Sequence, residues 1–128
     1  MRPAAAAFAL LALLAQKANA ASALDMTLVL PHPLRAGETA WIEVQVGPIG
    51  HQEIDVTTAS GQELGVLSPF GVRVGQDAGT YTLPLPGDAI RDGRVSVRLT
   101  ITQFGAPPRA PTAQEVRSVK LTVAGVSR

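Results

Sequence analysis

Cysteine is absent from this sequence of 128 residues, so no disulfide, catalytic thiol or thiolate metal site can form. Asparagine occurs once, at Asn19, and leaves no acceptor for N-glycosylation in the rest of the chain. Aromatic residues are also scarce, at 4% of the chain. A domain without covalent cross-links must fold by burial alone, and about 100 residues are enough for that.

The first 20 residues show the order of features that is typical of a secretory signal peptide. Arg2 supplies a positive charge, and residues 4–15 form an unbroken apolar run. Small residues at 18 and 20 then permit cleavage before Ala21, with an alternative cut after Ala23. A spanning helix needs about 20 apolar residues, so this run is too short for a retained membrane anchor.

Removal of such a leader changes both the organisation and the charge of the chain. We predict a cleaved signal peptide at 1–20 and a single domain over 21–128, with no stable membrane insertion after cleavage. The leader contains Arg2 and Lys17, so its loss moves the formal charge from +1 to −1. A near-neutral domain has no electrostatic reason to bind nucleic acid. The expected location is the periplasm of a Gram-negative bacterium or the medium outside it.

Apolar residues recur at every second position along most of the remaining chain, a pattern that is typical of strands. Gly and Pro clusters separate the runs and indicate turns. Pro84 has no amide hydrogen, so its strand is expected at a sheet edge. The expected strands cover residues 26–30, 39–46, 53–58, 63–67, 70–74, 80–85, 94–103 and 115–123.

The order of the later elements favours an immunoglobulin-like sandwich over a closed barrel. A short helical corner is expected at 87–93, with Asp88 as its N-cap and Gly93 as its stop. A long strand, a proline-rich loop over 104–114 and a last strand follow, in the order of strands E, F and G of that fold. We therefore predict an all-β, immunoglobulin-like antiparallel β-sandwich of seven or eight strands.

No motif assembles a catalytic site, so the chain is not expected to be an enzyme. Nucleophilic catalysis needs a nucleophile, a base and an orienting acid, and Ser60 lacks the motif of a nucleophile elbow. The only histidines, His32 and His51, lie in expected loops. A metal site would need further ligands such as Met26 or Asp55. No cofactor is predicted, and a small-molecule or copper carrier using His32, His51 and Met26 is the alternative.

Two features suggest surfaces for protein binding. Trp41 shares the outward phase of its strand with polar neighbours, and an exposed tryptophan beside a sheet would indicate a contact surface. The alternative is that Trp41, at the start of its strand, folds back over the edge of the core. The loop over 104–114 is longer than the usual hairpin connection of about 2–5 residues. Three prolines stiffen it, Arg109 is expected at its tip, and stiff loops on a sandwich often carry recognition.

A third candidate surface depends on the last two long strands. If they pair, their outward side chains form one polar, basic stripe that suits an extended acidic or amide-rich chain. The stripe would contain Ser96, Arg98, Thr100, Thr102, Arg117, Lys120 and Thr122. The predicted protein-binding residues from all three surfaces are Trp41, Arg98, Thr100, Phe104, Pro108, Arg109 and Lys120.

The run from Tyr81 to Gln103, with residues 94–97 (RVSV) within it, resembles the curli-associated periplasmic chaperones, as do the small size and the missing enzyme motifs. The Cys-x-Cys of some members has no counterpart here. The resemblance implies an immunoglobulin-like fold and a role in keeping an amyloid fibre subunit soluble before secretion. We therefore expect an exported, non-enzymatic module whose partner is another exported protein. A structural fibre or adhesin subunit is a further alternative.

Overall fold

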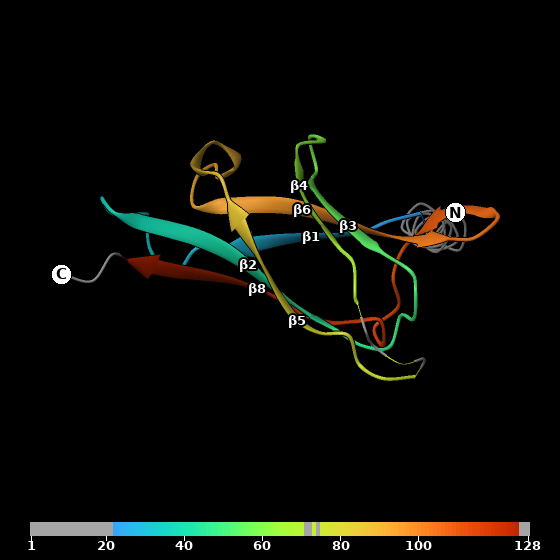
Figure 1. The fold of residues 1–128 in the computed structure, drawn as a ribbon. Coiled ribbons are helices and arrows are strands. Elements are labelled where there is room, and N and C mark those ends of the chain that lie inside the picture. Colours follow the sequence, from blue (N-terminus) through green and yellow to red (C-terminus); the bar gives the residue numbers. More distant parts are fainter. Residues whose placement is uncertain (1–21, 71–72, 74, 126–128) are drawn as a thin grey trace, which may run out of the picture.

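The computed structural model describes residues 22–70, 73 and 75–125, so the predicted leader lies outside the described residues (Figure 1). The described chain is all-β, as predicted. Its strands are β1 (Leu24–Val29), β2 (Glu38–Val46), β3 (Ile54–Thr58), β4 (Glu63–Leu67), β5 (Gly79–Leu85), β6 (Arg94–Gln103), β7 (Ala106–Arg109) and β8 (Val116–Gly125). A single 3-10 turn, η1 (Gly87–Ala89), is the one helical element in these ranges. None of the described segments is a helix long and apolar enough to cross a bilayer.

The strands form two antiparallel sheets that pack face to face (Figure 1). The large sheet has the order β1-β6-β3-β4, and the small sheet has the order β5-β2-β8. Ile101 of β6 pairs with Ile54 of β3 on one side and with Arg109 of β7 on the other. The short β7 therefore continues the row of β1 along β6. Pro84 lies in β5, an edge strand, as its missing amide hydrogen predicts.

The expectation that the last two long strands pair is wrong. β6 lies between β1 and β3 in the large sheet, whereas β8 pairs with β2 in the small sheet. The segment between them crosses from one sheet to the other instead of turning back, and Pro111 is buried at this crossing. Alternation specifies the face that a side chain occupies, but it carries no information about the neighbouring strand.

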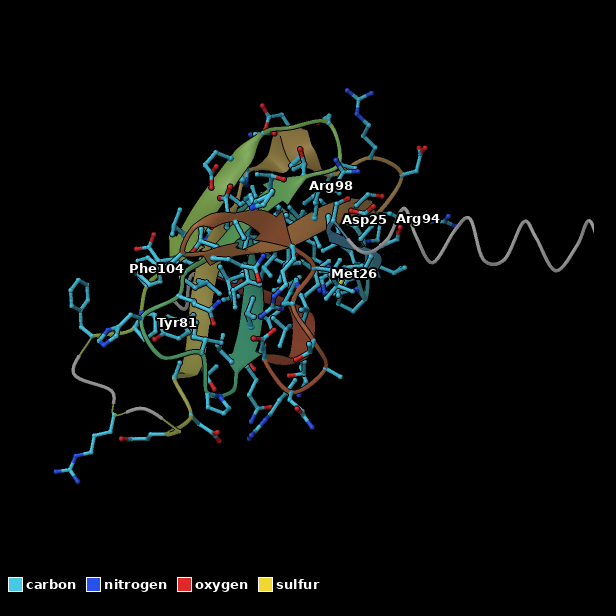
Figure 2. All side chains as sticks on the ribbon, turned by 90° about the vertical axis from the view of Figure 1, so that its right-hand side faces the viewer. Asp25, Met26, Tyr81, Arg94, Arg98 and Phe104 are labelled. Carbon is cyan, nitrogen blue, oxygen red and sulfur yellow. The ribbon has the colours of Figure 1, made fainter. Side chains whose placement is uncertain are left out.

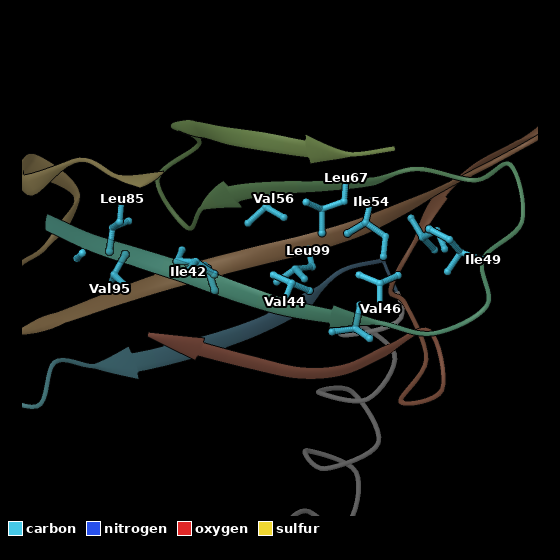
Figure 3. Close-up of a cluster of buried hydrophobic side chains, with 14 of the residues drawn as sticks. Ile42, Val44, Val46, Ile49, Ile54, Val56, Leu67, Leu85, Val95 and Leu99 are labelled. Carbon is cyan, nitrogen blue, oxygen red and sulfur yellow. The ribbon is translucent and has the colours of Figure 1, made fainter. Parts of the chain in front are cut away.

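The core between the sheets is made of aliphatic side chains. Ile42, Val44 and Val46 of β2 point inward with 0–1% exposure, as their alternation predicts. They face the inward row of the large sheet, which includes Val56 and Leu99 (Figure 3). Each such side chain stabilises the fold by roughly 1.5–3 kcal/mol when it leaves water. Trp41, Phe70 and Phe104 are absent from the buried set.

The corner between β5 and β6 differs from the expected helical turn. Pro86, not Asp88, occupies the N-cap of η1, and no side chain caps it. Asp92 and Gly93 have positive φ values of 54° and 72°, and Arg91 and Arg94 exchange two backbone hydrogen bonds across them. An Asp-Gly pair with two positive φ angles is the usual two-residue hairpin turn. Gly93 thus closes a tight turn into β6 and does not end a helix.

Candidate functional site

Aromatic side chains are few beyond residue 21, and the two phenylalanines among them both face solvent. The four aromatic residues of this part are Trp41, Phe70, Tyr81 and Phe104. Phe70 is 91% exposed and Phe104 is 87% exposed. Tyr81 packs against the core and donates a hydrogen bond to the Ala78 carbonyl at 3.3 Å. The exposed phenylalanines are therefore the most unusual feature of the described surface.

Both phenylalanines project from the same end of the large sheet. Leu67, Ile54 and Ile101 form one row across β4, β3 and β6. Phe70 follows three residues after Leu67, and Phe104 follows three residues after Ile101. Neighbouring strands lie about 4.8 Å apart, so the two carrying strands are about 10 Å apart. We call this end, with its two phenylalanines, the aromatic end.

The position of Phe70 corrects one strand expectation. The alternation over 70–74 predicted a strand with Phe70 on its apolar face, but Phe70 lies outside every strand. Residues 72 and 74 of that expected strand lie outside the described residues. The local pattern failed at Phe70 because Pro69 precedes it and Gly71 follows it, and this sequence favours a turn over a strand.

A row of polar groups ties the strand ends together beneath the phenylalanines. The Glu53 amide donates to Thr102 Oγ1 at 3.0 Å, and the Thr102 amide donates to the Glu53 carbonyl at 2.9 Å. Ser68 Oγ donates to the Glu53 carboxylate. Gln52 Nε2 adds a bond to the Thr102 carbonyl at 2.9 Å. These bonds join β3, β4 and β6 at the point where the exposed loops begin.

Phe104 stands on a braced two-residue turn. Phe104 and Gly105 connect β6 to β7, and the φ angle of Gly105 is 69°. Gln103 Nε2 donates to the Pro107 carbonyl at 2.7 Å across the turn, and Arg109 Nε donates to Gln103 Oε1 at 3.0 Å. Figure 2 looks onto this end and shows Phe104 at its periphery, well away from Arg98. The ring is thus held outward by a turn with little freedom to fold back.

Arg109 has a different place from the one expected. It is not at the tip of a free loop but at the end of β7, where its guanidinium binds Glu115 through two bonds of 2.7 and 2.8 Å. The Thr112 amide donates to the same carboxylate at 2.8 Å. The hydrogen bond from Arg109 lowers the pKa of Glu115 and raises the pKa of Arg109 itself. Arg109 thus holds the segment that crosses from one sheet to the other, and Phe104 is the residue at the exposed tip of the turn.

The other predicted binding residues lie on separate surfaces. Arg98 and Thr100 lie on the outer face of the large sheet, where Arg98 Nε binds Asp25 Oδ1 at 2.8 Å. Trp41 and Lys120 lie on the outer face of the small sheet, and Trp41 is half-buried beside Pro84. The predicted basic stripe is therefore divided between opposite faces of the sandwich. Pro108 is exposed on β7, close in sequence to Phe104.

The histidines do not come together. His32 follows β1, whose last residue pairs with Arg94 at the start of β6, and His51 precedes β3, whose first residue pairs with Ile101. Seven residues of strand separate these ends, which corresponds to about 23 Å. Met26 packs against the core. The described residues contain no group of three or more His, Cys, Asp or Glu side chains that could hold a metal ion.

Two carboxyl groups meet on the outer face of the large sheet. A hydrogen bond to Asp55, partial burial and the charge of Asp55 raise the pKa of Glu63. Asp55 Oδ1 is buried and accepts no hydrogen bond from any described residue. The two neighbouring carboxyls therefore disfavour the ionised form of Glu63.

The end of the sandwich opposite the aromatic end contains a groove. An open groove of about 570 Å³ lies between the β1–β2 loop and the corner before β6. Its lining is mostly apolar and includes Pro31, Leu34 and Ile90, with Arg94 at the rim. His32 lines the same groove, where its Nδ1 lies 2.9 Å from the Pro33 carbonyl.

Comparison with protein families, with curated proteins and with solved structures finds no match for this chain. The geometry of the described residues alone therefore carries the functional argument.

Proposed function

We propose that this chain is an exported, non-enzymatic protein-interaction module that holds apolar segments of another exported protein at its aromatic end. One observation carries the proposal. The chain beyond residue 21 has two phenylalanines, and both are exposed, Phe70 at 91% and Phe104 at 87%. A domain so short of aromatic residues would bury them if their role were stability. Exposure of both at one end supports a contact surface.

The expected binding free energy is that of a weak and reversible interaction. A partner that covers one ring gains roughly 1.5–3 kcal/mol from its burial. The bonds of Gln103 already hold the turn that carries Phe104, so little conformational entropy is lost there on binding. An amyloid subunit of the curli type is the favoured partner, because its unfolded chain exposes apolar, strand-forming segments. The proposed place of action is the periplasm or the medium.

The proposed fold class is an immunoglobulin-like sandwich with its terminal strands exchanged. β2 beside β5 matches strands B and E, and β6 beside β3 matches strands F and C. In that fold, the first strand lies beside B and the last lies beside F. Here β1 lies beside β6 and β8 lies beside β2, so each terminal strand occupies the other's place.

The alternative of a metal carrier receives no support from the geometry. His32 and His51 lie at opposite ends of the large sheet, and Met26 packs against the core. One ion cannot bind all three within one copy of the chain, because ligand bonds are only about 2 Å long.

The test uses protein purified from the periplasm of cells that express the full chain, where a mass beginning at Ala21 checks the predicted cleavage. A curli-type amyloid subunit is allowed to fibrillate with substoichiometric protein, and thioflavin fluorescence gives the lag time. We expect a clear delay, and the double variant Phe70→Ser/Phe104→Ser should lose most of it. The variant Val29→Ser is the matched control, because Val29 is 65% exposed at the opposite end.

Two results would contradict the proposal. One is a lag time that the wild-type protein leaves unchanged. The other is a double serine variant that delays fibrillation as well as the wild type does, since the phenylalanines would then have no part in the effect.

A further inference from the structure

The two lateral sides of the sandwich differ in how their strand edges are protected. On the side of β4 and β5, Leu83 lies directly over Gly65, where an added Cβ would stand 2.6 Å from Leu83 Cδ2. β5 contains Pro84, and β4 has five residues with a bulge in its pairing to β3. Close packing, a proline and a short irregular strand are the usual devices that prevent a new strand from adding.

The side of β1 and β8 has fewer of these devices, because the one irregularity in the pairing of β8 with β2 lies at the first residues of β8. β8 has ten residues, contains no proline, and pairs with β2 alone among the described strands. Beyond Val116, whose N–H donates to the Thr112 carbonyl at 2.9 Å, its other edge presents backbone N–H and C=O groups that pair with no described strand, along about 30 Å. The inward residues Val119, Leu121 and Val123 are half-buried, whereas their partners in β2 are fully buried. The core is thus least complete beneath this edge.

The charge on β8 has one sign. Arg117 and Lys120 are its charged residues, and it contains no acid. Arg117 NH1 binds Asp77 Oδ2 at 2.7 Å, while Lys120 makes no ion pair with any described residue. An incoming strand with an acidic residue beside Lys120 would gain a cross-strand pair. A second copy of β8 would bring the same cations and no acid.

We propose that the free edge of β8 binds an extended segment of a partner protein in which apolar and acidic residues alternate. The segment adds to the small sheet as a fourth strand. Its backbone pairs with β8, its apolar residues extend the core beside Leu121, and an acidic residue pairs with Lys120. The inference extends the proposed protein-binding function to a second surface and relies on that function only for the biological role of the contact.

The test uses the periplasmic protein labelled with ¹⁵N and a blocked peptide of sequence TVEVTVEVT. We expect saturable shifts in the amide signals of residues 116–125, together with slower hydrogen exchange of β8 amides. A peptide of the same composition without alternation, TTTEEVVVV, should cause neither change. Lys120→Glu should weaken binding of the alternating peptide roughly fivefold and favour the basic peptide TVKVTVKVT. The matched control is Thr80→Glu, which places the same charge on the same face but on the opposite edge strand.

Four outcomes would overturn the inference: no shifts at millimolar peptide, shifts that map to β4 and β5, shifts that map to the aromatic end, or occupation of β8 by a second copy in sizing experiments without peptide. Binding at β8 is read from its own amides. A failure there is therefore distinct from a failure of the fibrillation assay with the phenylalanine variants.

Discussion

The interior of the sandwich and its aromatic end use apolar residues in opposite ways. Leu99 lies at the centre of β6 with no exposed surface, and the side chains around it are valine, isoleucine and leucine. Phe104 lies five residues further along the chain and is 87% exposed on a braced turn. Aliphatic residues close the core, whereas Phe70 and Phe104 are kept out of it. In this domain, therefore, the apolar side chains that stabilise the fold are different residues from the large apolar side chains on the surface.

The largest expected effect separates these two roles. Leu99→Ala removes buried methyl groups from the core and should lower the free energy of unfolding by about 2–5 kcal/mol. Phe104→Ala should change the same quantity by no more than about 0.5 kcal/mol, because its ring packs on little. Urea unfolding followed by circular dichroism measures both variants. Equal losses in the free energy of unfolding would show that Phe104 supports the fold, which would contradict the difference drawn between the core and the aromatic end.

A smaller effect is expected at the base of the aromatic end. The side chain of Arg109 is 32% exposed and that of Glu115 is 14% exposed, so Arg109→Met should cost about 1 kcal/mol. The pair holds the pKa of Glu115 below its usual range. Its stabilisation is therefore complete above the unfolded-state pKa and is lost as the pH falls through the lower folded-state pKa.

Unfolding measured from neutral to acid pH checks this expectation. Arg109→Met should flatten the acid part of the stability profile, and Arg109→Lys should restore part of the slope. An unchanged profile in Arg109→Met would mean that the ion pair adds no stability.

The smallest expected effect has the opposite sign. The pKa of Glu63 is raised from 4.5, so the folded chain holds this proton more tightly than the unfolded chain does. Stability is then lost as the pH rises from 4.5 through the raised pKa. Glu63→Gln removes the ionisable group, so the free energy of unfolding should be slightly higher than that of the wild type at neutral pH. At acid pH the two proteins should have the same free energy of unfolding. Glu43→Gln, on the other sheet, is the control, and the same gain in both variants would contradict the assignment.

Strand positions and inward faces were largely predictable from the sequence, because hydrophobic alternation reports burial directly. The inward positions of Ile42 and Leu99 and the edge position of Pro84 are confirmed. The partner of each strand was not predictable, because alternation is the same for any neighbour. The pairing of β6 with β8 was therefore expected wrongly.

The candidate site was predictable only in part. Phe104 was identified from the length of its loop, but Phe70 was assigned to a strand that does not include it. Arg109 was taken as a loop tip because its partner, Glu115, lies six residues away in a segment with no regular pattern. One signal in the sequence pointed to the aromatic end: both phenylalanines beyond residue 21 stand next to glycine, in Phe70-Gly71 and Phe104-Gly105. Phenylalanine followed by glycine between strands fits a turn better than a core strand.

The exchange of the terminal strands has a consequence for how the chain acquires its structure. β1 pairs with β6 and β8 pairs with β2, so Asp25 meets Arg98 and Trp41 meets Thr122. Neither sheet is complete until segments some 70–80 residues apart have met, and such distant closures make folding slow, in the range of milliseconds to seconds. A nascent polypeptide would therefore lack a complete small sheet until its C-terminal strand has been synthesised.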